Sequence, residues 1–429
     1  MVLNTKSKAV SGYSLNKEST SKPSDVSFED AWQFIVKVGI AAHKYGSTAT
    51  RIESFLTFLS NNLGYSGVFR STPSEITFAL RESKKSLQRI EIIEVPSDVN
   101  LDKLAHVGEL LHKFKCGRLS LADASDQLDI IEQMKPAWGT WSIMSSYAFV
   151  GLGLPAILGG SWCDTLFATL LSIVVYGVVM LSTRLGATAK EWMPASAAFI
   201  SGTLAALVKL WIPELNLVLV VLSATAIILP GYTISLGAGE LVARHVVSGL
   251  TNLVDGLFCM IKLVIGGWLG IKLVTTLFSL GTSYTPAIPV DTSWLLLLFP
   301  TLMVGLCIVF QTPRRDLLWV TLVSVIAYIC VVAGTQLIGN SLGNLLGTIF
   351  SVIIANLWAR KMGRPSSIVL IPAVVMLVSG SIGFRGLAAM ANGELLLGSQ
   401  QFLQMFVVAL TITVGILMGH AIVRPESNL

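Results

Sequence analysis

Several ionisable side chains stand in or beside long apolar stretches of this 429-residue sequence, among them Glu240, Asp255 and Arg385. An ionisable group at the centre of a bilayer costs about 2.5–3.5 kcal/mol on insertion scales, so those that persist there usually serve a substrate or ion pathway. A carboxylate in a medium of low dielectric binds a proton more readily than it does in water. We therefore interpret Glu240 and Asp255 as proton-coupling candidates and Arg385 as a candidate contact for an anionic substrate group.

The spacing of these groups is compatible with two interpretations: pairing of opposite charges on one helix face, or positions in water or at the membrane surface. Glu240 and Arg244 are four positions apart with the acid first, so they can pair on one helix face. Asp255 and Lys262 are seven apart and can also share a face. Alternatively, Glu240 and Arg244 lie on an aqueous connecting helix, Lys262 extends along the helix to the interface, and Arg385 sits at the outer membrane surface.

Two apolar stretches are interrupted by proline and then by small residues. The first contains Pro230, Gly231 and Thr233, and the second contains Pro372 and Gly380. Proline removes a helical hydrogen bond and glycine loosens the backbone. Such interruptions persist in lipid only where protein or water satisfies the freed groups, so paired interruptions indicate a substrate site. The alternative is that proline and glycine are simply common in membrane helices.

Charge is distributed very unevenly along the chain. Overall, 53% of residues are hydrophobic and 13% are charged, but 33 of the first 136 residues are charged against 22 of the remaining 293. The first part has the composition of a soluble domain, and the second has that of a membrane protein. We expect a disordered tail over 1–26, a cytoplasmic α+β domain over 27–136, and two five-span membrane halves over 137–285 and 286–429.

Secondary-structure signals refine this division. In the front part, helices are expected from Ser27 to Gly46 and from about residue 48 to Gly64, followed by three strands and two more helices. The strands are expected at Gly67–Ser71, Glu75–Leu80 and Leu87–Val95, and the helices at Leu101–Lys115 and 120–134. Ten apolar stretches follow, at Trp141–Gly159, Thr165–Leu181, Trp192–Trp211, Leu215–Leu229, Leu250–Leu280, Trp294–Phe310, Leu317–Ala333, Leu342–Trp358, Ile368–Met390 and Phe402–Val423.

The positive charges predict an orientation for these spans. If the N-terminus is cytoplasmic, nine Lys or Arg residues fall on inner connections and two, Lys209 and Arg385, on outer ones. No apolar secretory segment stands at the start of the sequence, and ten spans return the chain to the starting side. We therefore expect a multi-pass protein of the inner (cytoplasmic) membrane with both termini in the cytoplasm. Because each half would hold an odd number of spans, the halves are expected to form 5+5 inverted repeats.

Motifs of other mechanisms are missing from the sequence. It contains no phosphate-binding GxxxxGK[ST] loop, no HExxH motif and no GxSxG elbow. The five cysteines form no CxxC pair, so neither a disulfide framework nor a zinc site is expected. We expect no enzyme activity, no cofactor and no metal. The net charge of +5 is too small and too dispersed to suggest nucleic-acid binding.

From about residue 30 onward the chain resembles the threonine/serine exporter family. The resemblance rests on the segment Gly46–Glu53, on Leu229–Thr233 with Glu240 and Leu241, and on Ile371–Pro372 with Gly380–Leu387. Two departures stand out: Val378-Ser379-Gly380 replaces the family's Val-Pro-Gly, and Asn252 stands near the place of a common arginine. The resemblance implies ten spans, a cytoplasmic N-terminal domain and export driven by a proton gradient.

The expected function is therefore secondary active export of threonine and serine by antiport with protons. Pro230, Gly231, Thr233, Pro372 and Gly380 would shape the substrate site at the repeat interface. The expected partners are a small-molecule substrate, protons and the lipid bilayer, with a homo-oligomer left open. The alternatives are a dicarboxylate (succinate-like) exporter, to which the resemblance also extends, and a membrane receptor or scaffold that transports nothing.

Overall fold

The computed structural model describes residues 27–82, 88–96, 98–278, 287–377 and 380–425, and every structural statement below concerns these ranges. The tail predicted to be disordered, residues 1–26, lies outside them. The predicted boundary between the membrane halves at residues 285 and 286 also lies outside them, as do Val378 and Ser379.

Residues 27–134 form the N-terminal unit, which has four helices and a three-stranded antiparallel sheet with the order β1-β2-β3. Its elements are α1 (Phe28–Lys44), α2 (Ala49–Asn62), β1 (Tyr65–Ser71), β2 (Glu75–Glu82), β3 (Gln88–Glu94), α3 (Leu101–Lys115) and α4 (Leu121–Gln133). Each helix and strand predicted for this region is present. Ser27 caps α1 by accepting a hydrogen bond from the Asp30 amide at 3.1 Å, as the sequence predicts.

The core of the N-terminal unit lies between the sheet and the helices. Phe69 of β1 stands opposite Phe78 of β2, and both side chains are buried. Trp32 of α1 packs against Phe78 with ring centroids 6.5 Å apart. Ile371, from a helix far along the chain, belongs to the same buried cluster. The core is therefore completed by a residue outside the unit.

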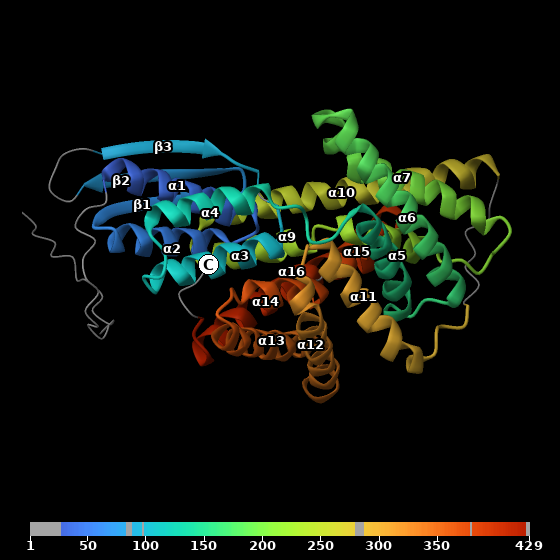
Figure 1. Ribbon diagram of the computed structural model, residues 1–429. Coiled ribbons are helices and arrows are strands. Elements are labelled where there is room, and N and C mark those ends of the chain that lie inside the picture. The colour runs from blue at the N-terminus through green and yellow to red at the C-terminus, as the bar shows by residue number, and fades with distance from the viewer. Residues whose placement is uncertain (1–26, 83–87, 97, 279–286, 378–379, 426–429) are drawn as a thin grey trace, which may run out of the picture.

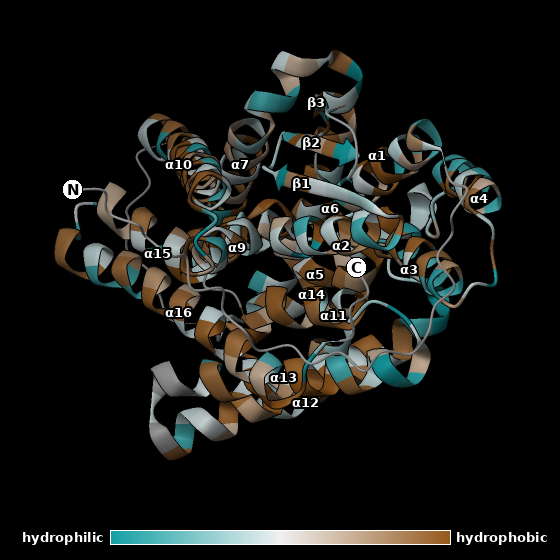
Figure 2. Cartoon of the chain, turned by 90° about the vertical axis from the view of Figure 1, so that its left-hand side faces the viewer, coloured by the Kyte–Doolittle hydropathy of each residue, from teal (hydrophilic) through white to brown (hydrophobic). Residues whose placement is uncertain are grey.

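The rest of the described chain is helical (Figure 1). Its helices are α5 (Thr140–Ile157), α6 (Trp162–Leu185), α7 (Ala187–Lys209), α8 (Leu217–Ala224), α9 (Gly231–Val242), α10 (Val246–Leu277), α11 (Leu295–Val309), α12 (Leu317–Ile338), α13 (Asn340–Met362), α14 (Ser367–Leu377), α15 (Gly380–Ala391) and α16 (Leu395–Ile422), with 3-10 turns at Ala226–Ile228, Thr292–Trp294 and Arg314–Asp316. Seven described segments are long and apolar enough to cross a membrane, or eight if one bent pair counts as a span. In Figure 2 brown, hydrophobic segments are frequent along α12, α14 and α16, whereas teal, hydrophilic segments are frequent along α4.

The first interruption predicted from the sequence falls between helices, and the second includes residues 378 and 379, which lie outside the described ranges. Residues 217–224 and 226–242 form the bent pair, with an angle of 61° between its two parts. Pro230 precedes the first residue of α9. In the second stretch the prediction for Pro372 is wrong in one respect: α14 continues through Pro372 to Leu377, so the proline does not end the helix. Gly380 begins α15.

The segments after the two interruptions have the same plan. The 12-residue helices α9 and α15 begin at residues 231 and 380, and the long helices α10 and α16 begin at residues 246 and 395, so both pairs are offset by 149 positions. Glycines at the same offset hold each pair together. A Cβ on Gly237 would lie 2.7 Å from the Gly249 carbonyl oxygen, and one on Gly386 would lie 2.9 Å from that of Gly398. These contacts require residues without a side chain.

The N-terminal unit is attached to the ends of the helices that follow it. The first turn of α3 donates backbone hydrogen bonds to the end of α11, from Leu101 to Phe310 at 3.0 Å and from Asp102 to Gln311 at 2.8 Å. In Figure 1 the unit lies at one end of the molecule, beside α9, α14 and the beginning of α10. This end is called the N-terminal side below.

Candidate functional site

A cavity of about 660 Å³ lies where the two interrupted stretches meet. The beginnings of α9 and α15 form one part of its wall, and residues of α5, α10, α11, α12, α13 and α14 contribute to the other parts. Six of the eight residues predicted from the sequence line it: Pro230, Gly231, Thr233, Asp255, Gly380 and Arg385. The structure thus brings together groups that are up to 155 positions apart in the chain.

Asp255 and Arg385 give this cavity one negative and one positive group. Asp255 projects from α10 and is exposed, whereas Arg385 is half-buried on α15. The Nε of Arg385 donates to the Ser381 carbonyl at 3.4 Å, and neither charged side chain has an ion-pair partner among the described residues. Opposite charges in one cavity can bind the two charged ends of a zwitterion.

Four further polar residues line the cavity, and the sequence analysis did not name them as site residues: Tyr232, Tyr328, Asn344 and Ser381. The Tyr328 ring stacks on Phe299, with centroids 4.3 Å apart. Single polar residues in apolar helices carry no periodic signal, and only their shared position at the cavity distinguishes them. The cavity therefore offers neutral hydrogen-bonding groups beside its two charges.

Glu240 lies outside the cavity wall and is buried between α9 and α10. Its carboxylate accepts hydrogen bonds from Ser248 Oγ at 2.7 Å and from Asn252 Nδ2 at 2.8 Å. The predicted pairing with Arg244 is wrong, because α9 ends at Val242 and Arg244 turns into the left-handed region with φ 67° and an exposed side chain. Asn252, one of the departures from the family pattern, is thus a direct partner of Glu240.

Two other expectations are also corrected. Pro372 is buried within α14 and does not line the cavity. Lys262 does not face Asp255. Its ammonium instead donates to the Glu191 carbonyl at 3.0 Å and lies 5.9 Å from the centre of the Trp192 ring.

The N-terminal unit reaches the cavity at one place and contacts the surrounding helices at others. Val99, in the loop before α3, contributes to the cavity wall. Arg51 of α2 donates to the hydroxyl groups of Ser366 (3.1 Å) and Ser367, where α14 begins. Tyr232 of α9 packs against the core cluster of the unit. The segment Gly46–Glu53, which carries part of the family resemblance, therefore contacts the helices that follow the N-terminal unit.

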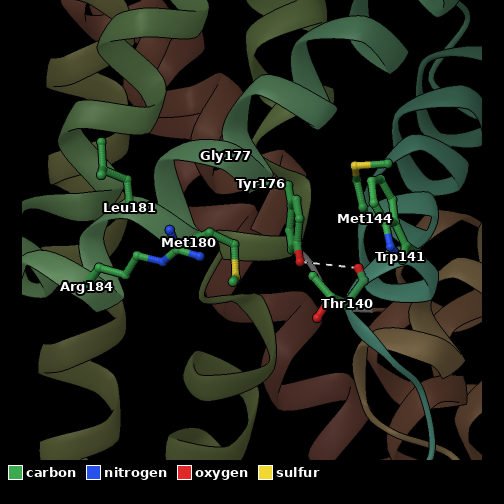
Figure 3. A pocket seen from close by; sticks show the side chains of 8 residues that line it. All are labelled: Thr140, Trp141, Met144, Tyr176, Gly177, Met180, Leu181 and Arg184. Atoms are coloured by element: carbon green, nitrogen blue, oxygen red, sulfur yellow. Dashed lines mark hydrogen bonds between the residues drawn. The ribbon is translucent and has the colours of Figure 1, made fainter.

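A separate hollow, of about 490 Å³, lies between α5 and α6 (Figure 3). Trp141 and Met144 stand on one side of it and Leu181 and Arg184 on the other, with the Tyr176 hydroxyl donating to the Thr140 carbonyl at 3.2 Å between them. It contains none of the predicted site residues. Among the described residues no three His, Cys, Asp or Glu side chains converge as metal ligands, and all five cysteines are free.

Comparison with known proteins finds two family models along the chain. Both describe threonine/serine exporters (ThrE), and they match residues 33–274 and 295–422. The first match covers the N-terminal unit and the helices through most of α10, and the second covers α11 to α16. No solved structure matches the chain.

Several curated fungal proteins are similar along most of the chain. An uncharacterized protein of Schizosaccharomyces pombe is 22% identical over 84% of this chain. Pheromone-regulated membrane protein 10 of Kluyveromyces lactis is 22% identical over 92% of it. The chain covers 44% of the length of each of these two relatives, so it spans less than half of the curated proteins it matches.

Proposed function

Because this chain belongs to the threonine/serine exporter family, we propose that it is a secondary exporter of small polar amino acids, threonine and serine, exchanged for protons. Family membership and the apolar helices make it a membrane transporter. The observation that carries the substrate assignment is the shared cavity of Asp255 and Arg385. Pro230, Gly231, Thr233 and Gly380 line the same space, whereas Pro372 would act only through packing.

The two charges favour an amino acid over a dicarboxylate. Arg385 suits a substrate carboxylate, since a guanidinium presents several donors in a fixed plane. Asp255 suits the ammonium group of the same molecule. A dicarboxylate would place its second carboxylate near Asp255 and would be repelled unless a proton were taken up. A cavity of this size and polarity has no purpose in a receptor or scaffold whose helices only anchor it.

Proton coupling is assigned to Glu240 and Asp255. Glu240 is buried and has two hydrogen-bond donors, so it can exchange a proton only when its surroundings rearrange. Asp255 is accessible from the cavity and can exchange a proton in the same place as the substrate. We propose that Asp255 links proton and substrate binding and that Glu240 responds to the movement of α9 against α10.

The proposed architecture has ten spans in two inverted halves, with residues 27–136 as a cytoplasmic domain. The constant offset of 149 positions between α9–α10 and α15–α16 supports a repeat. The positive charges at inner connections support an inner-membrane orientation with both termini inside. Partners would be the substrate, protons and lipid, and a homo-oligomer is compatible with this plan.

The test is efflux from vesicles that contain the purified protein. Vesicles are preloaded with radiolabelled threonine, serine or succinate, and efflux is followed with and without a pH gradient. We expect threonine and serine to leave faster with the gradient. Faster efflux of succinate alone would favour the dicarboxylate alternative. If none of the three moves under either condition, transport of these substrates is excluded.

A further inference from the structure

Another hollow, of about 540 Å³, opens between the same two groups of helices as the cavity. Residues of α8 and α10 line it from one side, and residues of α15 and the turn after it line it from the other. On α10 its lining residues lie beyond residue 263, further along the helix than those of the cavity, whereas on α15 the residues that line the two spaces alternate around residues 384 and 385. This hollow is called the second hollow below.

The two spaces follow one another along α10 and α15. On α10, Asp255 and Cys259 line the cavity, and Val264 and Lys272 line the second hollow. On α15, the neighbouring residues Arg385 and Phe384 line the cavity and the second hollow, respectively, so the two spaces lie on different sides of this helix. The spaces are therefore arranged in series along the interface of the two halves.

Buried apolar residues separate the two spaces. Leu222 of α8, Leu263 of α10 and Phe384 of α15 are at most 3% exposed and belong to one packed cluster. Because a polar solute would have to leave water to cross such a layer, the layer acts as a barrier between two polar spaces. Phe384 is the largest of these side chains and lines the second hollow directly.

The second hollow has the polar groups of a binding site. Lys272 and Glu394 stand exposed at its rim. Lys209, which is 9% exposed, donates to the Leu215 carbonyl at 2.9 Å and also lines the hollow. The indole Nε1 of Trp268, another lining residue, is shielded from solvent and has no hydrogen-bond partner in the described part of the chain. A buried donor without a partner is costly, and a bound acceptor would relieve this cost.

We propose that the second hollow is a separate binding station for the transported zwitterion, beyond the barrier of Leu222, Leu263 and Phe384. The substrate carboxylate lies near Lys272 and accepts from the Trp268 indole, and its ammonium group faces Glu394. Like the cavity, the station combines positive groups, Lys209 and Lys272, with a negative group, Glu394. It lies at the far end of the pathway from the N-terminal unit. This inference rests on the proposed function for the identity of the ligand.

Equilibrium binding of radiolabelled threonine to the purified full chain tests the station without requiring transport. We expect two sites per chain in the wild type and one in either Lys272→Gln or Trp268→Phe. Arg385→Gln should lose the other site and keep the station. Lys190→Gln, which changes an exposed lysine that does not line the second hollow, serves as the control and should keep both sites. A single site in the wild type, or two unchanged sites in both station variants, would overturn the proposal.

The barrier is tested by Phe384→Ala in the efflux assay. We expect several-fold faster efflux of threonine without a pH gradient, because the layer between the stations is opened. Phe258→Ala removes an equally large side chain from an exposed position on α10 and should leave this efflux unchanged. Equal efflux from wild type and Phe384→Ala would contradict the barrier. Two threonine sites without any flux would retain the station and refute the proposed transport.

Discussion

Gly231 and Gly380, the first residues of α9 and α15, meet backbone to backbone. A Cβ added to Gly380 would lie 3.1 Å from the Gly231 Cα and 3.4 Å from its amide nitrogen. Contacts this short are tolerated only if the neighbour moves, and here the neighbour is main chain. The two interruptions therefore form a single junction that joins the two halves at the cavity.

The first prediction concerns this junction. Gly380→Ala should force the two backbones apart by a few tenths of an ångström and slow threonine efflux about tenfold, equivalent to ~1.4 kcal/mol in the transport barrier. Threonine efflux by the Gly380→Val variant should be slower still. Gly177→Ala is the matched control, because a Cβ there would meet no atom within 4 Å. Wild-type efflux from a folded Gly380→Val protein would show that the junction does not limit transport.

Arg385 is expected to determine the affinity for the substrate carboxylate. A hydrogen bond to a charged group contributes about 1.5–3 kcal/mol, so Arg385→Gln should raise the KM for threonine at least tenfold. The variant should also lose discrimination between threonine and threonine amide, which lacks the negative charge. Arg184→Gln removes an arginine from the hollow of Figure 3 and should change neither quantity. An unchanged KM in Arg385→Gln would remove this residue from the site.

Two substitutions of Glu240 distinguish its role in proton coupling from its role in the stability of the protein. Glu240→Gln keeps a side-chain oxygen that can accept hydrogen bonds from Ser248 and Asn252 but cannot bind and release a proton. We expect efflux that no longer responds to a pH gradient. Glu240→Ala leaves two buried donors unpaired and should lower the free energy of unfolding by about 1–3 kcal/mol. Gradient-driven efflux in both Glu240→Gln and Asp255→Asn would refute the assignment of these two carboxylates.

The burial of His43 is expected to make the stability of the N-terminal unit depend on pH. Its imidazole is buried and contacts the Val95 carbonyl at 3.0 Å and Ser71 Oγ at 3.2 Å. Burial lowers the pKa of His43 below its usual 6.5, although backbone contacts with Val95 and Pro73 oppose the shift. The unfolded chain therefore binds the proton more readily, so stability is complete above about pH 6.5 and falls as the pH drops towards the folded-state pKa.

Hydrogen exchange of the full chain can measure this effect. Between pH 7.5 and 5.5, protection of α1 and β1 should decrease after correction for the intrinsic exchange rate. His43→Gln should remove the decrease, and His112→Gln, at a partly exposed position of α3, should retain it. The same pH response in wild type and His43→Gln would assign it to other groups.

Local patterns in the sequence predicted much of the fold and six of the residues that line the cavity. The alternation in residues 88–94 predicted β3, and proline followed by glycine at Pro230 and Gly231 predicted the bend before α9. The matching position of Gly380 in the second half pointed to a shared site. These features depend on residues adjacent in the chain and on the repetition of one pattern later in the chain. Both can be recognised in a single sequence.

Contacts between distant segments could not be predicted in this way. The pairing of Glu240 with Ser248 and Asn252 depends on the left-handed turn at Arg244, a conformation that is uncommon for arginine. The contact of Arg51 with Ser367 joins positions 316 apart. Such contacts leave no periodic trace, because they are decided by how complete elements pack.

The docking of the N-terminal unit gives the last prediction. Arg364, between α13 and α14, binds Glu109 of α3 at 2.7 Å and Asp316 at 2.6 Å, and it is mostly buried. Arg364→Gln leaves Arg315 as the remaining described ion-pair partner of the Glu109 and Asp316 carboxylates, and the loss of the Arg364 hydrogen bonds should cost about 1–3 kcal/mol of docking energy. Amide exchange in α3 should then accelerate tenfold or more, because the hydrogen bond from Asp102 to Gln311 is released. Arg360→Gln, an exposed arginine of α13, should leave α3 protected, and equal protection in both variants would show that Arg364 does not hold the unit in place.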